Sequence, residues 1–327
     1  MTARFQGGPS MSPKTRQLLL NLVRIGVSAG LLAWVLSTIK LDALAGTLRE
    51  ADPRPYGLAL IIGLAGIGLR AWRWQVLLRA VGVGLPFRRL VYLYFVGAFF
   101  NTFLPTGFGG DVVRVLEAGG EADRARVAGT TIVDRLTGFI MLFAVALAAL
   151  PFAGGLLTGG LSGAIAAGGV GLLAGSVLLF EGRLLRGITD RLPLPKALAL
   201  TGDGWLARMY AAITACGRGA LLRALGVSLL FNLSLMVAGV LIAQALKIAV
   251  PAAALFVIVP VATVSLLLPS ISGLGVREQA YVLLFAQLGV GSEPALAFSL
   301  AYYSLDLAAG LVGGLIYLLA GLLRLRA

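Results

Sequence analysis

The feature that most constrains this chain is a series of apolar stretches, each long enough to cross a bilayer. About 20 apolar residues in a helix span the hydrocarbon core. Six stretches reach that length: Leu18–Ile39, Tyr56–Leu78, Val127–Leu150, Leu161–Phe180, Leu222–Leu246 and Ala295–Leu323. Only 13% of the residues are charged, against about 25% in soluble domains. The sequence therefore predicts an all-α integral membrane protein, with residues 1–327 forming a single membrane domain.

Two further apolar stretches are each interrupted by proline and glycine. Leu90–Leu104 runs into Pro105-Thr106-Gly107-Phe108-Gly109-Gly110-Asp111, and Ala252–Leu268 runs into Pro269-Ser270-Ile271-Ser272-Gly273-Leu274-Gly275. Such a break frees backbone groups that lipid cannot satisfy, so it is tolerated where it is buried in protein or lines a water-filled cavity. We therefore predict two re-entrant helical hairpins, at about residues 90–126 and 252–289.

The distribution of basic residues predicts the orientation of these segments. Most of the 27 Lys and Arg fall on one side if the two termini, 79–89, 112–126 and 181–223 are cytoplasmic, as the positive-inside rule requires. The first hairpin must then enter from the cytoplasm and the second from the opposite face. The two repeats, at about 18–150 and 161–323, form an inverted-topology repeat, which is typical of transporters. The expected location is the cell (inner) membrane.

One segment between the spans has an amphipathic pattern. Residues 196–216 carry apolar side chains at helical spacing: Trp205, Leu206, Met209, Tyr210 and Ile213. This pattern favours an interfacial helix, and a plain cytoplasmic loop is the alternative.

Composition removes several classes of function. The chain has no histidine and one cysteine, Cys216, which excludes His-based acid–base chemistry and Ser-His-Asp catalysis. No Cys or His cluster suits a metal, and no Walker-type loop is present, so we expect no cofactor and no ATP-driven pumping. The net charge of +13 is explained by Lys and Arg residues in the cytoplasmic segments next to the membrane spans. We therefore expect no nucleic-acid partner.

Ionisable residues at membrane depth indicate function because they are costly to keep there. Asp111 and Arg114 follow the first break, and Arg277 and Glu278 follow the second. A helix that restarts after a break offers free N–H groups and a positive dipole end, which suit an anion. Two arginines would add bidentate contacts to a phosphate or carboxylate. The alternative is that the two acid–base pairs only neutralise each other.

Other polar residues lie in or beside the spans. Asp134 could partner either hairpin arginine and Arg135 could add to the anion site, or this pair could lie at headgroup level with Arg135 snorkelling. Arg70 and Arg73, beside Trp72 and Trp74, favour anchoring at the inner interface.

Two further residues complete the predicted site. Asp306 could pair with Arg277, take part in proton coupling or make a structural hydrogen bond, and Asn101 could cap freed carbonyls or contact substrate. The candidate substrate-binding residues are Asn101, Pro105, Thr106, Gly109, Gly110, Asp111, Arg114, Asp134, Arg135, Pro269, Ser270, Gly273, Gly275, Arg277, Glu278 and Asp306.

These motifs resemble those of a known family. The run Asn101–Arg114 resembles the hallmark of the lysylphosphatidylglycerol synthase transmembrane-region family, which is also called the flippase-like domain family. Leu268–Glu278 looks like its second motif, and Asp134-Arg135 before Gly138 resembles its short acidic–basic motif. The resemblance covers essentially the whole chain.

The resemblance implies a membrane domain that moves lipids between leaflets. In the full-length synthases it is fused to a cytoplasmic aminoacyl-tRNA-dependent transferase. Because this chain ends at Ala327, directly after its last predicted span, we expect the transferase to be absent. Stand-alone members are also linked to polyprenyl-phosphate sugar and other glycolipid pathways.

We therefore expect a lipid flippase or transporter that is not an enzyme. It would move an anionic phospholipid, an aminoacyl-lipid or a polyprenyl-phosphate-linked lipid through a positively charged midplane cavity. One alternative is an integral-membrane transferase acting on a lipid-linked substrate, with Asp111 or Glu278 as the base. Another is a non-catalytic partner of a separate lipid synthase. The expected partners are membrane lipids with anionic headgroups and a lipid-modifying enzyme.

Overall fold

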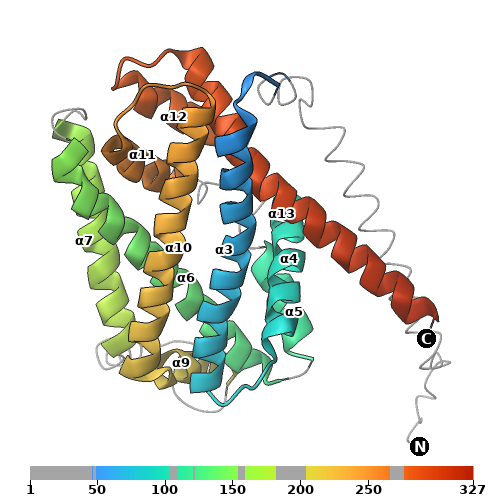
Figure 1. Cartoon of the computed structure of the whole chain (residues 1–327). Helices are drawn as coiled ribbons and strands as arrows, with labels where there is room; N and C mark the ends of the chain where they lie inside the picture. Colours follow the sequence, from blue (N-terminus) through green and yellow to red (C-terminus); the bar gives the residue numbers. More distant parts are fainter. Residues whose placement is uncertain are drawn as a thin grey trace, which may run out of the picture.

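The computed structural model describes residues 46, 49–103, 109–120, 122–153, 159–181, 204–265 and 276–326. These residues are helical throughout, without a strand among them (Figure 1). Four described helices are long and apolar enough to cross a membrane: Pro53–Ala80, Arg124–Phe152, Gly217–Ala245 and Ser292–Leu323. The prediction of an all-α membrane protein is confirmed. The predicted span Leu18–Ile39, residues 104–108 of the first break and the whole of the second break lie outside the described residues.

The first half of the structure contains four α-helices. They are α3 (Pro53–Ala80), α4 (Phe87–Phe103), α5 (Gly109–Ala118) and α6 (Arg124–Ala149), and α6 continues into the 3-10 turn η1 (Leu150–Ala153). Both long helices begin at an aspartate, the residue type that best satisfies free N–H groups at a helix start. Asp52 accepts a hydrogen bond from the N–H of Arg54, and Asp123 accepts one from the N–H of Ala125, each at 2.9 Å.

The second half contains six described helices. They are α7 (Gly159–Glu181), α9 (Trp205–Ala215), α10 (Gly217–Ala245), α11 (Ala252–Ser265), α12 (Val276–Ala286) and α13 (Ser292–Arg326). The predicted span Leu161–Phe180 falls within α7. Helix α9 lies within the segment predicted as interfacial, and its buried Tyr210 and Ile213 pack with α6 residues such as Val127.

Each predicted hairpin corresponds to two short helices that pack together, α4 with α5 and α11 with α12. In the first hairpin the two helices run antiparallel, because Gly97 lies beside Arg114 while Asn101 lies beside Gly110. Glycine permits this close approach, since a Cβ atom on Gly110 would overlap the backbone carbonyl of Gly97. The pair is closed by a hydrogen bond of 2.7 Å from the Gly110 N–H to the side-chain carbonyl of Asn101.

The packing between the two halves is symmetric in pattern. Helix α3 packs along its counterpart α10, and α4 packs on α13 as α11 packs on α6. Helices α3 and α10 run antiparallel, since Asp52 bonds to Ala245 near one end while Arg73 bonds to Ser228 in the opposite part of the contact. The α4–α5 pair lies toward the lower end of α3 and the α11–α12 pair toward the upper end (Figure 1). Counterpart elements therefore enter from opposite faces, as an inverted repeat requires.

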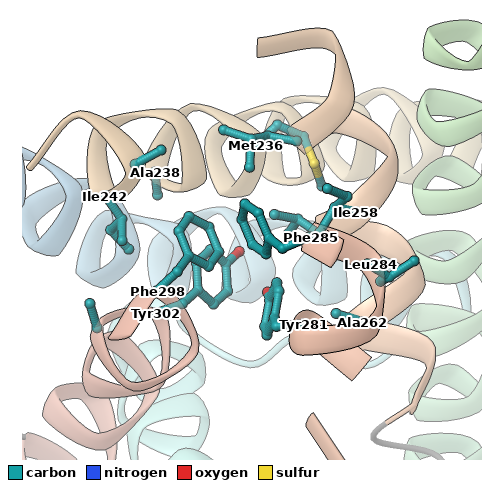
Figure 2. Close-up of a cluster of buried hydrophobic side chains, with 14 of the residues drawn as sticks. Met236, Ala238, Ile242, Ile258, Ala262, Tyr281, Leu284, Phe285, Phe298 and Tyr302 are labelled. Atoms are coloured by element: carbon teal, nitrogen blue, oxygen red, sulfur yellow. The ribbon is translucent and has the colours of Figure 1, made fainter. Parts of the chain in front are cut away.

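An aromatic cluster fixes the second hairpin against the last span (Figure 2). Tyr281 and Phe285 of α12 face Phe298 and Tyr302 of α13, and Phe298 lies 5.2 Å from Tyr281 and 5.0 Å from Phe285 between ring centroids. Offset and edge-to-face aromatic pairs at such distances add to the packing energy. Because Tyr281 lies one helical turn beyond Arg277, this cluster also holds the start of α12 in place.

A polar contact between α3 and α13 gives a first testable prediction. The hydroxyl groups of Tyr56 and Ser304 are joined by a hydrogen bond of 2.6 Å. Because hydrogen bonds between membrane helices contribute about 0.6 kcal/mol on average, Tyr56→Phe should lower the free energy of unfolding by about that amount. Denaturant unfolding in detergent micelles measures it. In the double variant with Ser304→Ala the two losses should be less than additive, and full additivity would show that the bond contributes nothing.

Candidate functional site

A cavity of about 320 Å³ lies between the two halves, lined by residues of both hairpins and of α3, α6, α10 and α13. Its described lining includes five arginines and three aspartates: Arg70, Arg73, Arg114, Arg135, Arg277, Asp111, Asp134 and Asp306. These side chains leave a formal excess of two positive charges. The cavity is therefore polar and cationic, although it lies among helices long and apolar enough to span a membrane.

Asp134 of α6 is the most enclosed acid of the site, with 1% of its surface exposed. One carboxylate oxygen accepts a hydrogen bond of 2.6 Å from Arg73 Nε, and the other accepts one of 2.5 Å from the Tyr94 hydroxyl. The Nη1 atom of Arg114 lies 3.7 Å from the second oxygen. Arg73 also donates to Ser228 of α10 at 3.0 Å. This network joins α3, α4, α5, α6 and α10 around one buried carboxylate.

Arg114 of α5 is buried and already has several partners. Its guanidinium forms an ion pair with Asp111, which also forms an ion pair with Arg135. The Arg114 Cζ lies 4.0 Å from the ring centroid of Tyr94 and 4.8 Å from that of Trp74. Contacts of this kind with aromatic faces stabilise a buried cation. Asp111 thus holds together two of the arginines proposed for the anion site.

Arg277 of α12 is equally buried but is less completely paired. Its Cζ lies 4.1 Å from the ring centroid of Tyr303. The nearest described carboxylate oxygens belong to Glu278, 3.7 Å from Nη2, and Asp306, 3.9 Å from Nη1. Both distances exceed that of a hydrogen bond, and Nε and Nη2 of Arg277 are buried without a hydrogen-bond partner in the described part of the chain.

Arg70 and Arg73 line the cavity, so the prediction that they anchor the inner interface is wrong. Arg73 is 4% exposed and belongs to the Asp134 network. The Cζ atom of Arg70 lies 5.5 Å from the ring centroid of Tyr94 and 5.3 Å from that of Phe231. Among the described residues, its buried Nε has no hydrogen-bond partner and no carboxylate forms an ion pair with Arg70.

Comparison with known protein families agrees with the motifs in this site. The family model described as "Lysylphosphatidylglycerol synthase TM region" matches residues 21–314. The chain belongs to this family. A search of curated proteins found no match. The matched range includes both hairpins and the residues that line the cavity between them. Membership in the lysylphosphatidylglycerol synthase transmembrane-region family supports a lipid-related function in a membrane.

The structure brings together most of the described candidates in this family member. The side chains of Asn101, Asp111, Arg114, Asp134, Arg135, Arg277 and Asp306 line the cavity, and Glu278 is adjacent to it through Arg277. Gly109 and Gly110 are buried at the start of α5. Pro105, Thr106, Pro269, Ser270, Gly273 and Gly275 lie outside the described residues.

Asn101 has a structural role beside the predicted ones. It lines the cavity, so the prediction that it contacts substrate stays open. Its side-chain carbonyl also accepts the hydrogen bond from Gly110 at the start of α5. One of the free N–H groups expected to attract an anion is therefore already satisfied. This lowers the capacity of the α5 N-terminus to bind a ligand and places more of that role on the arginines.

Several lining residues were absent from the predicted site. Among them are Tyr94 of α4, Phe231 and Asn232 of α10 and Tyr303 of α13. Asn232 donates a hydrogen bond of 3.2 Å to the Gly138 carbonyl and so ties α10 to α6. An asparagine within an apolar span was a usable signal for Asn232, because polar groups in membrane helices usually face the protein interior. The aromatic residues carry no such signal in an apolar sequence.

Proposed function

We propose that this protein moves a lipid with an anionic headgroup between the two leaflets of a membrane. The observation that carries the proposal is the cationic cavity at the junction of two oppositely oriented halves. A polar site at such a junction is characteristic of transporters built from inverted repeats. Family membership supports a lipid as the cargo. Candidate cargoes are an anionic phospholipid, an aminoacyl-lipid and a polyprenyl-phosphate-linked lipid.

The arrangement suggests how such a lipid would move. The headgroup would enter the cavity and be held by arginine, while its acyl chains remain in the bilayer. Rocking of one half against the other would then expose the headgroup to alternate leaflets. An ion gradient, or the lipid gradient itself, would supply the driving force. Asp306 is the favoured proton carrier, because its side chain is 65% exposed whereas Asp111 and Asp134 are held by arginines.

The proposal includes the setting of the protein. Its basic loops would face the cytoplasm, with both termini on that side of the cell membrane. It would act without chemistry of its own, and a separate lipid-modifying enzyme would supply or use its cargo. Formation of a lipid product by the purified protein with a candidate donor would instead favour the transferase hypothesis.

A double substitution in the cavity tests the proposal. The Arg114→Ala, Arg277→Ala variant removes one arginine from each hairpin and should lower headgroup translocation at least tenfold, because the remaining cavity loses its charge excess. Translocation is measured with labelled anionic phospholipid in liposomes containing the purified protein.

The matched control is Arg79→Ala, Arg208→Ala, which removes two exposed arginines outside the cavity and should leave the rate unchanged. An unaltered rate in the Arg114→Ala, Arg277→Ala variant would refute this assignment of the site.

A further inference from the structure

The guanidinium of Arg277 presents an unused edge inside the cavity. Its side chain is 4% exposed, and Nε and Nη2 have no hydrogen-bond partner among the described residues. Oε1 of Glu278 faces Nη2 at 3.7 Å, which is beyond hydrogen-bond distance. These two nitrogens form one of the edges with which arginine binds two oxygens of a carboxylate or phosphate at once. A buried donor without an acceptor is energetically costly. The site thus contains a preformed pair of N–H donors without acceptors, a fork whose two donors an oxyanion would satisfy.

Asp306 lies on the other side of the same guanidinium. Its carboxylate is 3.9 Å from Nη1, the nitrogen outside the unused edge. Arg70, whose own Nε has no hydrogen-bond partner among the described residues, lines the same cavity. Because 65% of the Asp306 side chain is exposed, it has room to change its rotamer. Asp306 can therefore move closer to Arg277 when no anion is bound at Nε and Nη2, and it can move away when an anion binds there.

The corresponding arginine of the first hairpin differs in this respect. Arg114 already forms an ion pair with Asp111, and Asp134 faces its Nη1 atom at 3.7 Å. An anion there would have to displace a carboxylate that is also held by Arg135. The two hairpins are therefore unequal: the arginine of the first is held by a carboxylate within hydrogen-bond distance. The carboxylates beside the arginine of the second, those of Glu278 and Asp306, lie 3.7 and 3.9 Å away, so this arginine is more available.

We propose that the Nε–Nη2 edge of Arg277 binds a phosphate group and that Asp306 is a built-in competitor for Arg277, which promotes release. This inference rests on the proposed function and deepens it, since it names the phosphate as the part of the cargo that is recognised. Without a competitor, a buried arginine–phosphate pair would hold its cargo too tightly for transport. With Asp306 beside it, Arg277 exchanges one anion for another and is never left without a counter-charge.

Binding of a short-chain lipid to the full chain in neutral detergent tests this assignment. The probe is dioctanoyl phosphatidic acid, titrated by calorimetry, with dioctanoylglycerol as the phosphate-free counterpart. Arg277→Gln should weaken binding of the phosphatidic acid at least tenfold. Arg277→Lys should lie between wild type and Arg277→Gln, because it keeps the charge and loses the fork. Arg114→Gln should weaken binding less than Arg277→Gln does, and the exposed control Arg79→Gln should change binding less than threefold.

The role of Asp306 is tested in the same assay. Asp306→Asn should tighten binding several-fold, and this gain should largely disappear in the Arg277→Gln background, because competition requires the shared arginine. A gain that persists undiminished in that background would reduce Asp306 to a general repulsive charge and overturn the competitor role. Weaker binding in Asp306→Asn would overturn it too, since Asp306 would then be positioning Arg277.

Three other outcomes decide the identity of the ligand. Equal affinity for dioctanoylglycerol, or equal weakening by Arg114→Gln and Arg277→Gln, would overturn the phosphate site at Arg277. Inorganic phosphate that binds with the same dependence on Arg277 would support the site and assign it to free phosphate. Failure of lipid translocation in liposomes, with the binding pattern intact, would refute the proposed function and leave the phosphate site standing.

Discussion

Replacing Asp134 by alanine is expected to destabilise the protein by about 3–5 kcal/mol, the usual cost of removing one partner from a buried ion pair. Asp134 accepts hydrogen bonds from Arg73 and Tyr94 and faces Arg114. Its removal would leave two buried guanidinium groups short of a counter-charge, in a cavity that already has a positive excess. Thermal and denaturant unfolding in detergent micelles measure the loss.

The control for this variant removes a carboxylate at the surface. Glu293, in the first turn of α13, is exposed, and Glu293→Ala should change stability by less than about 1 kcal/mol, the range of a surface charge near a helix start. A loss in Asp134→Ala no larger than in Glu293→Ala would contradict the prediction. It would mean that Arg73 and Arg114 are neutralised by other groups, with Asp111 as the nearest described candidate.

The membrane fold could be predicted from sequence because its signals are local. A run of about 20 apolar residues has few alternatives to a spanning helix, and Pro53–Ala80 and Ser292–Leu323 were anticipated within a few residues. The breaks could be recognised equally well. Proline and glycine end a membrane helix only where protein or water satisfies the freed N–H and C=O groups of the backbone. The paired helices α4–α5 and α11–α12 flank the two breaks.

The composition of the cavity was harder to predict because it depends on which face of a helix meets another helix. Arg70 and Arg73 lie beside two tryptophans, a pattern typical of an interfacial anchor. In the structure Trp72 is half-exposed while Trp74 is fully buried. The arginine face of α3 therefore points inward, and only the packing of α3 against α10 and α6 decides this.

The inequality of the two hairpins could not be predicted from their motifs. Both motifs place an arginine next to an acid after the break, so their sequences suggested similar roles for Arg114 and Arg277. The difference arises from residues that other helices supply. Asp134 and Arg135 of α6 close the network around Arg114 and Asp111, whereas Arg277 meets Asp306 of α13, which stays largely exposed. Partners supplied by other helices determine which arginine is available.

The close approach of α4 and α5 makes Gly110→Ala the most disruptive small substitution that we expect in the first hairpin. The added Cβ would overlap the backbone carbonyl of Gly97 and crowd the side chain of Asn101. A backbone atom cannot rotate away as a side chain can, so the two helices must separate. Overpacking typically costs about 1–3 kcal/mol, and here the separation would also break the Asn101–Gly110 hydrogen bond.

Because α5 carries Arg114 and Asp111 into the cavity, this separation should also abolish lipid translocation. The liposome assay measures the rate, and thermal unfolding in detergent micelles measures the loss of stability. The control is Gly68→Ala in α3, where an added Cβ meets no atom within 4 Å. Because the added methyl group meets no other atom, transport should stay intact. Because alanine favours a helix interior more than glycine does, stability should rise by up to about 1 kcal/mol. Normal stability and transport in Gly110→Ala would show that the hairpin opens in the working protein and that α4 and α5 need not touch. The same substitution therefore distinguishes a hairpin that moves as one rigid arm from one whose two helices separate during transport.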